Sequence, residues 1–235
     1  MDTSLSAEND CDICGGAGFV HPVENGMVRY DRTATCVCME RELAERRREY
    51  LLKSCQFPIG SEHMTIDNYK LGKDLQAGYN ASVEMADNSG TPKWIALIGG
   101  NDTGKTHLGI AVCRKWVEAG IAARYTLVSL LLDELREGFR VNDGEGYAER
   151  FRYYCNIPLL LLDDLGIESK TAWVQEKLDT IIDYRLMNKL SLIVTSNTTL
   201  DDMQQRIRSR IIRHGDIYDM GTEEYSLSAR RAIGK

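Results

Sequence analysis

The sequence predicts an α/β fold in which a parallel sheet is flanked by helices, preceded by a small separate module and a connecting helix. Short apolar runs alternate with segments of helical period, which is the pattern of βαβ units. The runs at 95–98 and 159–162 are apolar at every position, as expected of strands buried on both faces. Four of the seven cysteines lie within residues 11–38, ahead of the first such run.

Composition limits the class of protein. A chain of 235 residues is long enough for one core domain and a small appendage. Its 43% hydrophobic and 27% charged residues are typical of soluble globular proteins. No apolar run has membrane-spanning length and the polar start is not a signal peptide, so we expect a cytoplasmic protein without a membrane partner. A net charge of −6 means that any nucleic-acid surface must be local.

The N-terminal cysteines predict a zinc site. They form the pairs Cys11-x-x-Cys14 and Cys36-x-Cys38, and four thiolates can close a tetrahedral Zn²⁺ site. Cysteines of a reducing compartment are more often ligands or buried thiols than disulfides. So small a fragment has little core, so metal binding would supply its folding free energy. His21 is a possible substitute ligand because the second pair is spaced by one residue, and four unrelated thiols are the plainer alternative.

The elements around this module are short. Residues 19–20 and 27–30 alternate in polarity and predict a small hairpin. Residues 39–52 predict a charged helix whose arginines at 46–48 belong either to a solvated connector or to a DNA or partner surface. The break at 56–60 marks a domain boundary. We therefore divide the chain into a zinc-binding module at 1–40, a linker helix at 41–60 and a larger α/β domain at 61–235.

Alternation of helices and strands continues through the larger domain, after a loop that ends near residue 70. Strands are expected at 95–98, 124–128, 159–162 and 192–196, with a short further strand after residue 217. Helices are expected at 74–88, 108–120, 130–139, 147–154, 171–189 and 204–215.

A phosphate-binding loop joins the first of these strands to its helix. The spacing is GxxxxGK[ST], and a strand before it and a helix after it are the context in which this motif binds phosphates. Its backbone N–H groups and the helix N-terminus would hold a triphosphate, Lys105 would contact the β- and γ-phosphates, and the Thr106 hydroxyl would bind Mg²⁺. A chance glycine-rich turn is the alternative. The expected ATP-binding residues are Gly99, Gly100, Asn101, Asp102, Thr103, Gly104, Lys105 and Thr106.

Polar residues follow two other strands. Asp163 and Asp164 end the four-leucine strand, at the edge where α/β sheets bind ligands. We expect this neighbouring strand to supply Asp163 as the magnesium ligand and Asp164 to polarise the attacking water. Asn197 ends the next strand and could orient water or touch the γ-phosphate. The alternatives are a helix-capping turn for the two aspartates and a simple turn at Asn197.

Two basic segments could contact other molecules. In the helix at 204–215, Arg206, Arg210 and Arg213 fall on one face, although cations near a helix C-terminus also suit the helix dipole on a solvated face. The segment at 150–154 interleaves arginines with Tyr153 and Tyr154. It is a candidate single-stranded DNA patch, with core-facing tyrosines as the alternative.

Together these motifs resemble one family. The order is a cysteine cluster, a basic helix, GGNDTGKTHLGIAV, LLLLDDLG, IVTSN and RIRSRI. The chain resembles the DnaC/DnaI-type bacterial replicative helicase loaders, which are AAA+ ATPases. It is also similar to the IstB-type helper ATPases of transposition. The phosphate loop followed by His-Leu and the Asp-Asp strand are the most specific parts of the resemblance.

The resemblance implies roles by position. The phosphate loop would be Walker A, the two aspartates Walker B and Asn197 sensor I. Arg206 and Arg210 match the arginine pair that follows sensor I, and Arg210 would be an arginine finger that reaches the nucleotide of a neighbouring subunit. Such a finger requires self-association or a partner. Arg230 or Arg231 would lie near sensor II.

Two departures from the family pattern bear on catalysis. The chain has Asp102 where the family often has glycine, and Asp164 where it often has glutamate. Aspartate tolerates a left-handed backbone, but its charge lies close to a triphosphate. Both departures favour a slow, switch-like ATPase.

The implied function is ATP-dependent loading of the hexameric replicative DNA helicase in replication initiation. The zinc module would contact the helicase, and the AAA+ domain would bind ATP, Mg²⁺ and single-stranded DNA. The alternatives are a transposition helper, which the cysteine module disfavours, and a nucleotide-binding adaptor with little hydrolysis, which Asp102 favours. A small-molecule kinase is a remote third.

Overall fold

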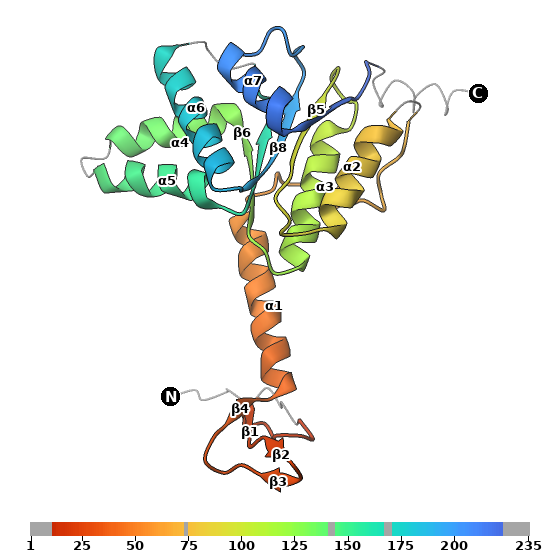
Figure 1. The fold of residues 1–235 in the computed structure, drawn as a ribbon, viewed down its shortest axis with the longest axis vertical. Coiled ribbons are helices and arrows are strands. Elements are labelled where there is room, and N and C mark those ends of the chain that lie inside the picture. The colour runs from red at the N-terminus through yellow and green to blue at the C-terminus, as the bar shows by residue number, and fades with distance from the viewer. Residues whose placement is uncertain (1–10, 73–74, 141–143, 167–170, 223–235) are drawn as a thin grey trace. The chain divides into compact units, whose positions relative to one another are not determined.

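The computed structural model describes residues 11–72, 75–140, 144–166 and 171–222, and the chain divides into two compact units, Met1–Tyr50 and Leu51–Lys235 (Figure 1). The division falls inside the first helix, α1 (Val37–Ser54), which extends the predicted 39–52 at both ends. The three-part division into 1–40, 41–60 and 61–235 stays a prediction. Within the described ranges, no helix combines the length and apolarity needed to cross a membrane.

The N-terminal unit contains two short antiparallel strand pairs. β1 (Phe19–Val20) pairs with β4 (Ala34–Thr35), and β2 (Val23–Glu24) pairs with β3 (Met27–Val28). The predicted hairpin was therefore wrong in its pairing, since residues 19–20 do not pair with 27–28. Asn25 and Gly26 have φ of 52° and 76°, and an Asn-Gly pair in left-handed backbone makes the tight turn that connects β2 to β3.

The larger unit is built on a five-stranded parallel sheet with the order β6-β7-β8-β5-β9. We had expected the strand that ends in the two aspartates to be the direct neighbour of the phosphate-loop strand. The structure corrects this, because β8 lies between β5 and β7. The strand bounds are β5 (Trp94–Ile98), β6 (Ala123–Leu127), β7 (Leu159–Asp163), β8 (Ser191–Ser196) and β9 (Asp216–Asp219).

Helices cover both faces of this sheet (Figure 1). On one face lie α2 (Gln76–Asp87) and α3 (Lys105–Glu118). The other face is covered by α4 (Val128–Arg140), α5 (Gly144–Asn156), α6 (Ala172–Met187) and α7 (Gln205–His214). The predicted helices occur within a few residues of their expected bounds. Thr171 caps α6, because its hydroxyl accepts a hydrogen bond from the backbone N–H of Val174.

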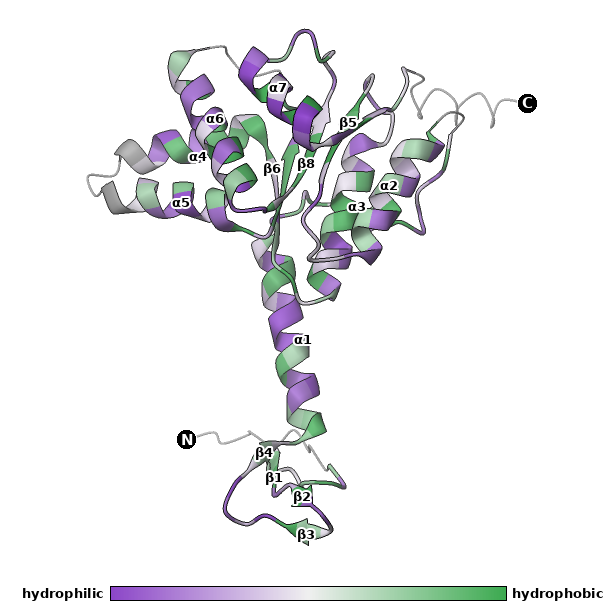
Figure 2. Ribbon diagram, viewed as in Figure 1, coloured by the Kyte–Doolittle hydropathy of each residue, from purple (hydrophilic) through white to green (hydrophobic). Residues whose placement is uncertain are grey.

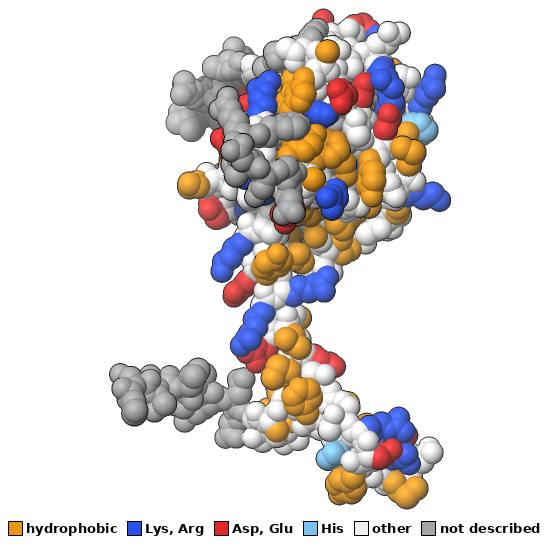
Figure 3. Space-filling model, turned by 90° about the vertical axis from the view of Figure 1, so that its left-hand side faces the viewer, with side chains coloured by type: hydrophobic (Ala, Val, Ile, Leu, Met, Phe, Trp, Pro, Cys, Tyr) orange, Lys and Arg blue, Asp and Glu red, His pale blue; other side chains and the backbone are white. Residues whose placement is uncertain are grey.

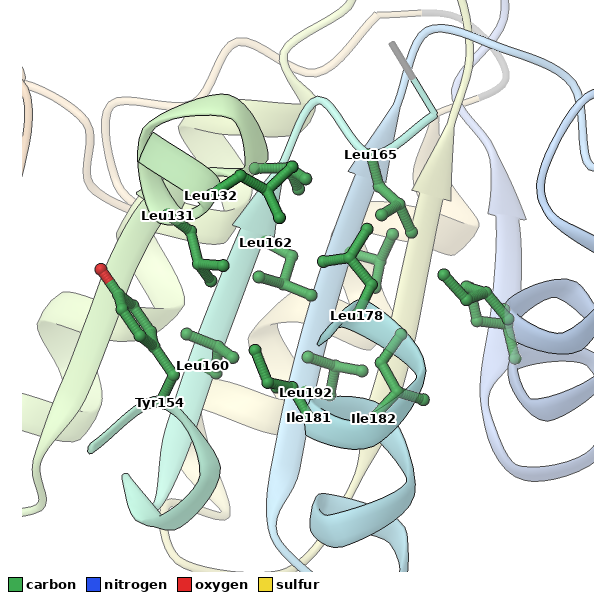
Figure 4. Close-up of a cluster of buried hydrophobic side chains, with 14 of the residues drawn as sticks. Leu131, Leu132, Tyr154, Leu160, Leu162, Leu165, Leu178, Ile181, Ile182 and Leu192 are labelled. Atoms are coloured by element: carbon green, nitrogen blue, oxygen red, sulfur yellow. The ribbon is translucent and has the colours of Figure 1, made fainter. Parts of the chain in front are cut away.

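The four leucines of β7 divide between two cores. Leu160 and Leu162 pack with α4, α5 and α6 (Figure 4), whereas Leu159 and Leu161 pack under α3. This alternation follows from the two-residue period of a strand, and it accounts for a run that is apolar at every position. The colouring by hydropathy shows the same central strands as apolar (Figure 2).

Arg185 in α6 is a buried charge that ties the sheet to its helices. Its side chain is completely buried, and Nη1 donates to the carbonyl oxygens of Tyr154, at 3.0 Å, and Ile157, at 2.8 Å. Nη2 donates to the carbonyl oxygens of Pro158, at 3.2 Å, and Ser191. The guanidinium thus donates to backbone carbonyl oxygens at the end of α5 and at the starts of β7 and β8.

We expect Arg185→Met to lower the free energy of unfolding by about 3 kcal/mol, because several buried carbonyl oxygens lose their donor. Urea unfolding followed by circular dichroism measures this. Arg213→Met, which removes an exposed arginine, is the matched control and should change stability little. Equal stability of the two variants would contradict the structural role of Arg185.

Candidate nucleotide-binding site and metal centre

The loop between β5 and α3 requires glycine at two of its positions. A Cβ on Gly104, where φ is 86°, would lie 2.7 Å from a ring carbon of Tyr69. A Cβ on Gly99 would lie 2.6 Å from the carbonyl oxygen of Gly221, in the chain that follows β9. Asp102 adopts φ of 54°, so this aspartate accepts the left-handed backbone that the sequence analysis expected it to tolerate.

Lys105 lies inside this loop. Its side chain is 4% exposed, and Nζ donates to the carbonyl oxygens of Gly99, at 3.1 Å, and Gly100, at 2.5 Å, and to the Thr103 hydroxyl, at 3.2 Å. Burial lowers the pKa of Lys105, while the carboxylates of Asp164, Asp163 and Asp102 raise it. The Lys105 ammonium is therefore held inside the phosphate loop by hydrogen-bond acceptors of the loop, and the oxygens of a bound anion could replace these acceptors.

Asp163 is the centre of a hydrogen-bonded cluster at the end of β7. It is 2% exposed, and its Oδ1 accepts from the hydroxyls of Thr106, at 2.8 Å, and Thr195, at 2.5 Å. Oδ2 accepts from Tyr125 at 3.1 Å. Burial, with the negative charge of Asp163, raises the pKa of Tyr125, so the phenol stays a donor. The cluster joins α3 to β6, β7 and β8.

Asp164 and Asn197 form the more open part of the site. The Asn197 amide donates to Asp164 Oδ1 at 2.7 Å, and the Asp164 backbone N–H donates to the Thr195 hydroxyl at 3.0 Å. Burial raises the pKa of Asp164, and the charge of Asp163 raises it further. Asp164 has φ of 59°, which turns it out of the strand direction. The structure thus brings together the two aspartates and Asn197, while the roles expected of them stay predictions.

A pocket of about 560 Å³ opens beside these groups. One wall is the phosphate loop with Asp164 and Asn197, and the other is the segment that precedes α2. Tyr69 in that segment stacks on Tyr79 with ring centroids 5.6 Å apart and meets the His107 ring edge-on at 5.3 Å. Burial raises the pKa of Tyr69 to about 12. The segment contributes His63, Met64, Asn68, Tyr69 and Lys70 to the lining.

Sequence reasoning missed four side chains of this site: Tyr69, His107, Tyr125 and Thr195. Thr195 carried a usable signal, because it is a polar residue near the C-terminal end of an apolar strand, where α/β sheets bind ligands. Tyr125 lies in a strand that the sequence had identified only as apolar. Tyr69 reaches the site through a loop, and no local pattern marks it.

The two arginines proposed as a pair do not line this pocket in the described part of the chain. Arg206 contacts Asp179 at 3.3 Å, and Arg210 binds both carboxylate oxygens of Asp183. Their role toward a neighbouring nucleotide stays a prediction. Arg230 and Arg231 lie outside the described residues.

The tyrosines of the candidate DNA patch separate in the structure. Tyr154 is 1% exposed, and its hydroxyl donates to Glu134 at 2.5 Å, so it belongs to the core and cannot stack on a base. The core-facing alternative was correct for this residue. Tyr153 is 37% exposed and lies near Arg150, in the lining of a different pocket from the one beside the phosphate loop.

The four N-terminal cysteines converge as expected of a metal centre. The sulfurs of Cys11 and Cys36 are 3.8 Å apart, those of Cys14 and Cys38 are 3.4 Å apart, and all four lie within 4.8 Å of one another. Tetrahedral Zn²⁺ with bonds near 2.3 Å places its sulfurs about 3.8 Å apart, so the geometry fits this ion. His21 Nδ1 contacts the Arg32 carbonyl oxygen at 2.9 Å instead, and His21 is not part of the cluster.

Comparison with known proteins gives a family match over most of the chain. The sequence model of the IstB-like ATP-binding proteins matches residues 26–231. The chain is 26% identical over 173 residues to the chromosomal replication initiator DnaA of Borreliella afzelii, covering 71% of this chain and 35% of that protein. It is 30% identical over 138 residues to DnaA of Burkholderia cenocepacia, covering 57% and 26%. The chain thus spans about a third or less of these relatives.

Solved structures share the fold. AMPPCP-bound DnaA from Aquifex aeolicus superposes with a TM-score of 0.63 at 20% identity, over 74% of this chain and 55% of that chain. The DnaC helicase loader superposes with a TM-score of 0.61 at 21% identity, over 69% and 99%. DnaI gives 0.60 at 22% identity, over 70% and 94%.

We expect the purified chain to carry about one zinc ion, and Cys38→Ser to lose it, because three thiolates leave the tetrahedron open. Elemental analysis gives the zinc content. Cys155→Ser, which removes a buried thiol outside the cluster, is the matched control and should keep the ion. A chelator should also make residues 11–38 sensitive to protease. Zinc retained by Cys38→Ser at the wild-type level would refute the site.

Proposed function

The chain belongs to the family of IstB-like ATP-binding proteins, and from that premise we propose that it is an ATP-dependent loader of the hexameric replicative DNA helicase, acting in replication initiation. The observation that carries the nucleotide-binding part is the convergence of Lys105, Thr106 and Asp163 beside one pocket. The proposed division is a zinc module at 1–40, a linker helix at 41–60 and an AAA+ domain at 61–235.

The phosphate loop and the Asp163 cluster suit ATP with Mg²⁺. Backbone N–H groups of residues 99–106 would hold the phosphates, and the Lys105 ammonium would exchange its carbonyl partners for phosphate oxygens. Thr106 and Asp163 offer the hard oxygen ligands that Mg²⁺ prefers. The bound ion would neutralise phosphate charge, which favours displacement at phosphorus.

Hydrolysis would use the more exposed residues. Asp164 faces the pocket and would accept a proton from water, while Asn197 holds its carboxylate in place. Arg210 would act on the nucleotide of a neighbouring copy, with Arg206 beside it, so turnover would depend on self-association. Asp102 keeps a negative charge near the phosphates and favours slow, switch-like turnover.

The N-terminal unit offers a surface for the helicase. Phe19, Val23, Met27 and Tyr30 are each more than half exposed, and Figure 3 shows apolar side chains (orange) at the surface of this unit. Exposed apolar side chains gathered on so small a module are typical of a protein contact. Within the AAA+ domain, Tyr153 and Arg150 are the part of the earlier DNA patch that can still contact single-stranded DNA. A DnaA relative of the same fold is known in complex with AMPPCP and single-stranded DNA.

A transposition helper is the second candidate. The matching family model, which covers residues 26–231, is named for IstB-like proteins, and this favours a partner transposase and duplex DNA. The Cys cluster favours the loader, because it supplies a separate docking module. A nucleotide-binding adaptor with little hydrolysis is the third, and Asp102 is the feature that favours it.

Two substitutions separate ATP binding from hydrolysis. Lys105→Ala should weaken ATP–Mg²⁺ binding at least about tenfold, because a charge-assisted contact is lost. Asp164→Asn should leave binding intact and slow turnover by about 100-fold, because a proton acceptor is lost. Calorimetry and phosphate release measure the two effects. Asp133→Asn, an exposed carboxylate on α4, is the control. Unchanged turnover in Asp164→Asn would leave the adaptor as the better assignment.

Helicase binding can be tested without disturbing the metal. Met27→Ser should reduce co-purification with a replicative helicase and keep its zinc, because Met27 is 67% exposed and ligates nothing. Met187→Ser is the matched control, since Met187 on α6 is 75% exposed in the other unit. Zinc is measured on the same samples. Binding to a transposase and duplex DNA, with none to the helicase, would favour the transposition helper.

A further inference from the structure

Two acidic side chains on α6 face two of the four arginines of α7. Asp179 and Asp183 are four residues apart on one helix, and Arg206 and Arg210 are four residues apart on the other, so each carboxylate meets one guanidinium. Residues four apart share a helix face, so two ion pairs form side by side between the two helices. The two pairs differ in burial: the Arg206 side chain is 66% exposed, whereas that of Arg210 is 18% exposed.

The Arg210 guanidinium has a partner at each nitrogen. Nε and Nη2 donate to the two carboxylate oxygens of Asp183, with Nη2 to Oδ2 at 2.6 Å. Nη1 donates to the carbonyl oxygen of Arg206 at 3.0 Å. The Nε–Nη2 edge, one of the two edges through which a guanidinium can bind a phosphate in bidentate fashion, is therefore occupied by a carboxylate of its own chain.

We propose that Asp183 is a latch that holds Arg210 on its own subunit until another copy of the chain presents a bound nucleotide. This rests on the proposed function, in which Arg210 acts in trans. A triphosphate carries more negative charge than one carboxylate and offers equivalent oxygens, so it can displace Asp183 from the same nitrogens. Asp183 is thus a positioning residue that acts through Arg210. When Arg210 leaves Asp183 for the nucleotide of another copy, this one exchange promotes both self-association and ATP hydrolysis.

The experiment uses the full-length, zinc-loaded chain with ATP–Mg²⁺. In Asp183→Asn the carboxylate is lost at constant size, so Arg210 is released without a cavity. We expect the protein concentration at half-maximal turnover to fall by about threefold to fivefold, as for loss of one ion pair. Sedimentation should show the same shift in self-association. In the Arg210→Ala background, where turnover is already reduced, Asp183→Asn should no longer shift self-association in sedimentation, because the latch then holds nothing.

A matched control separates the latch from a change in net charge. Asp201→Asn removes the same charge from the ion pair of Asp201 with Arg208, also on α7, at 2.6 Å. It should leave the half-maximal concentration where it was. Thermal unfolding of each variant reports whether folding is preserved.

The outcomes are distinct. A lower turnover in Asp183→Asn, or an unshifted half-maximal concentration in a folded protein, overturns the latch while leaving the arginine finger in place. An equal shift in Asp201→Asn also overturns it, since net charge would then be the cause. If Arg210→Ala alone turns over ATP like the wild type at every concentration, the finger itself fails, and the latch fails with it.

Discussion

A single buried carboxylate, that of Asp163, sets the geometry on which the nucleotide site depends. Burying a charge away from water costs free energy unless the charged group is hydrogen-bonded. The Asp163 carboxylate meets this requirement, because it accepts hydrogen bonds from the hydroxyls of Thr106, Tyr125 and Thr195. These donors come from α3, β6 and β8, so satisfying one side chain fixes the phosphate-loop helix against three strands. A magnesium ion would use the same oxygens, and it would then lie between the phosphate loop and the sheet.

The two units reach stability by different routes. The larger unit buries both faces of its sheet, with one core under α2 and α3 and another under α4 to α7. In its described part, the N-terminal unit has short strand pairs, leaves apolar side chains such as Met27 exposed and shows no core like that of the larger unit. The four converging thiols fit a zinc ion, and a bound ion would supply folding free energy that burial does not, because metal binding is coupled to folding in such modules. This leaves the apolar surface of the unit available to a partner.

Much of the fold could be predicted because its signals are local. The glycine and lysine spacing of residues 99–106, the four leucines of β7 and the cysteine pairs each contain their own physical reason within a few residues. The predicted pairing of the hairpin was wrong because it rested on the alternation of polarity in residues 19–20 and 27–30. The turn at Asn25 and Gly26, with its left-handed backbone, sets the register instead. The position of Tyr154 could not be decided from the sequence, because a tyrosine beside arginines on a helix has the same local pattern in a DNA-binding groove and in a core.

The sequence by itself determined which residues could be proposed for the two sites: the phosphate loop, Asp163, Asp164, Asn197 and the cysteines, because such sites need fixed residue types at fixed spacing. Only the tertiary structure decided their neighbours. In the sheet, β8 lies between β5 and β7. Tyr69 contacts the phosphate loop at Thr103, thirty-four residues away, and Arg210 pairs with Asp183 on another helix. Such contacts depend on strand order and helix packing, which are set by burial summed over the whole domain and leave no mark in any short stretch of chain.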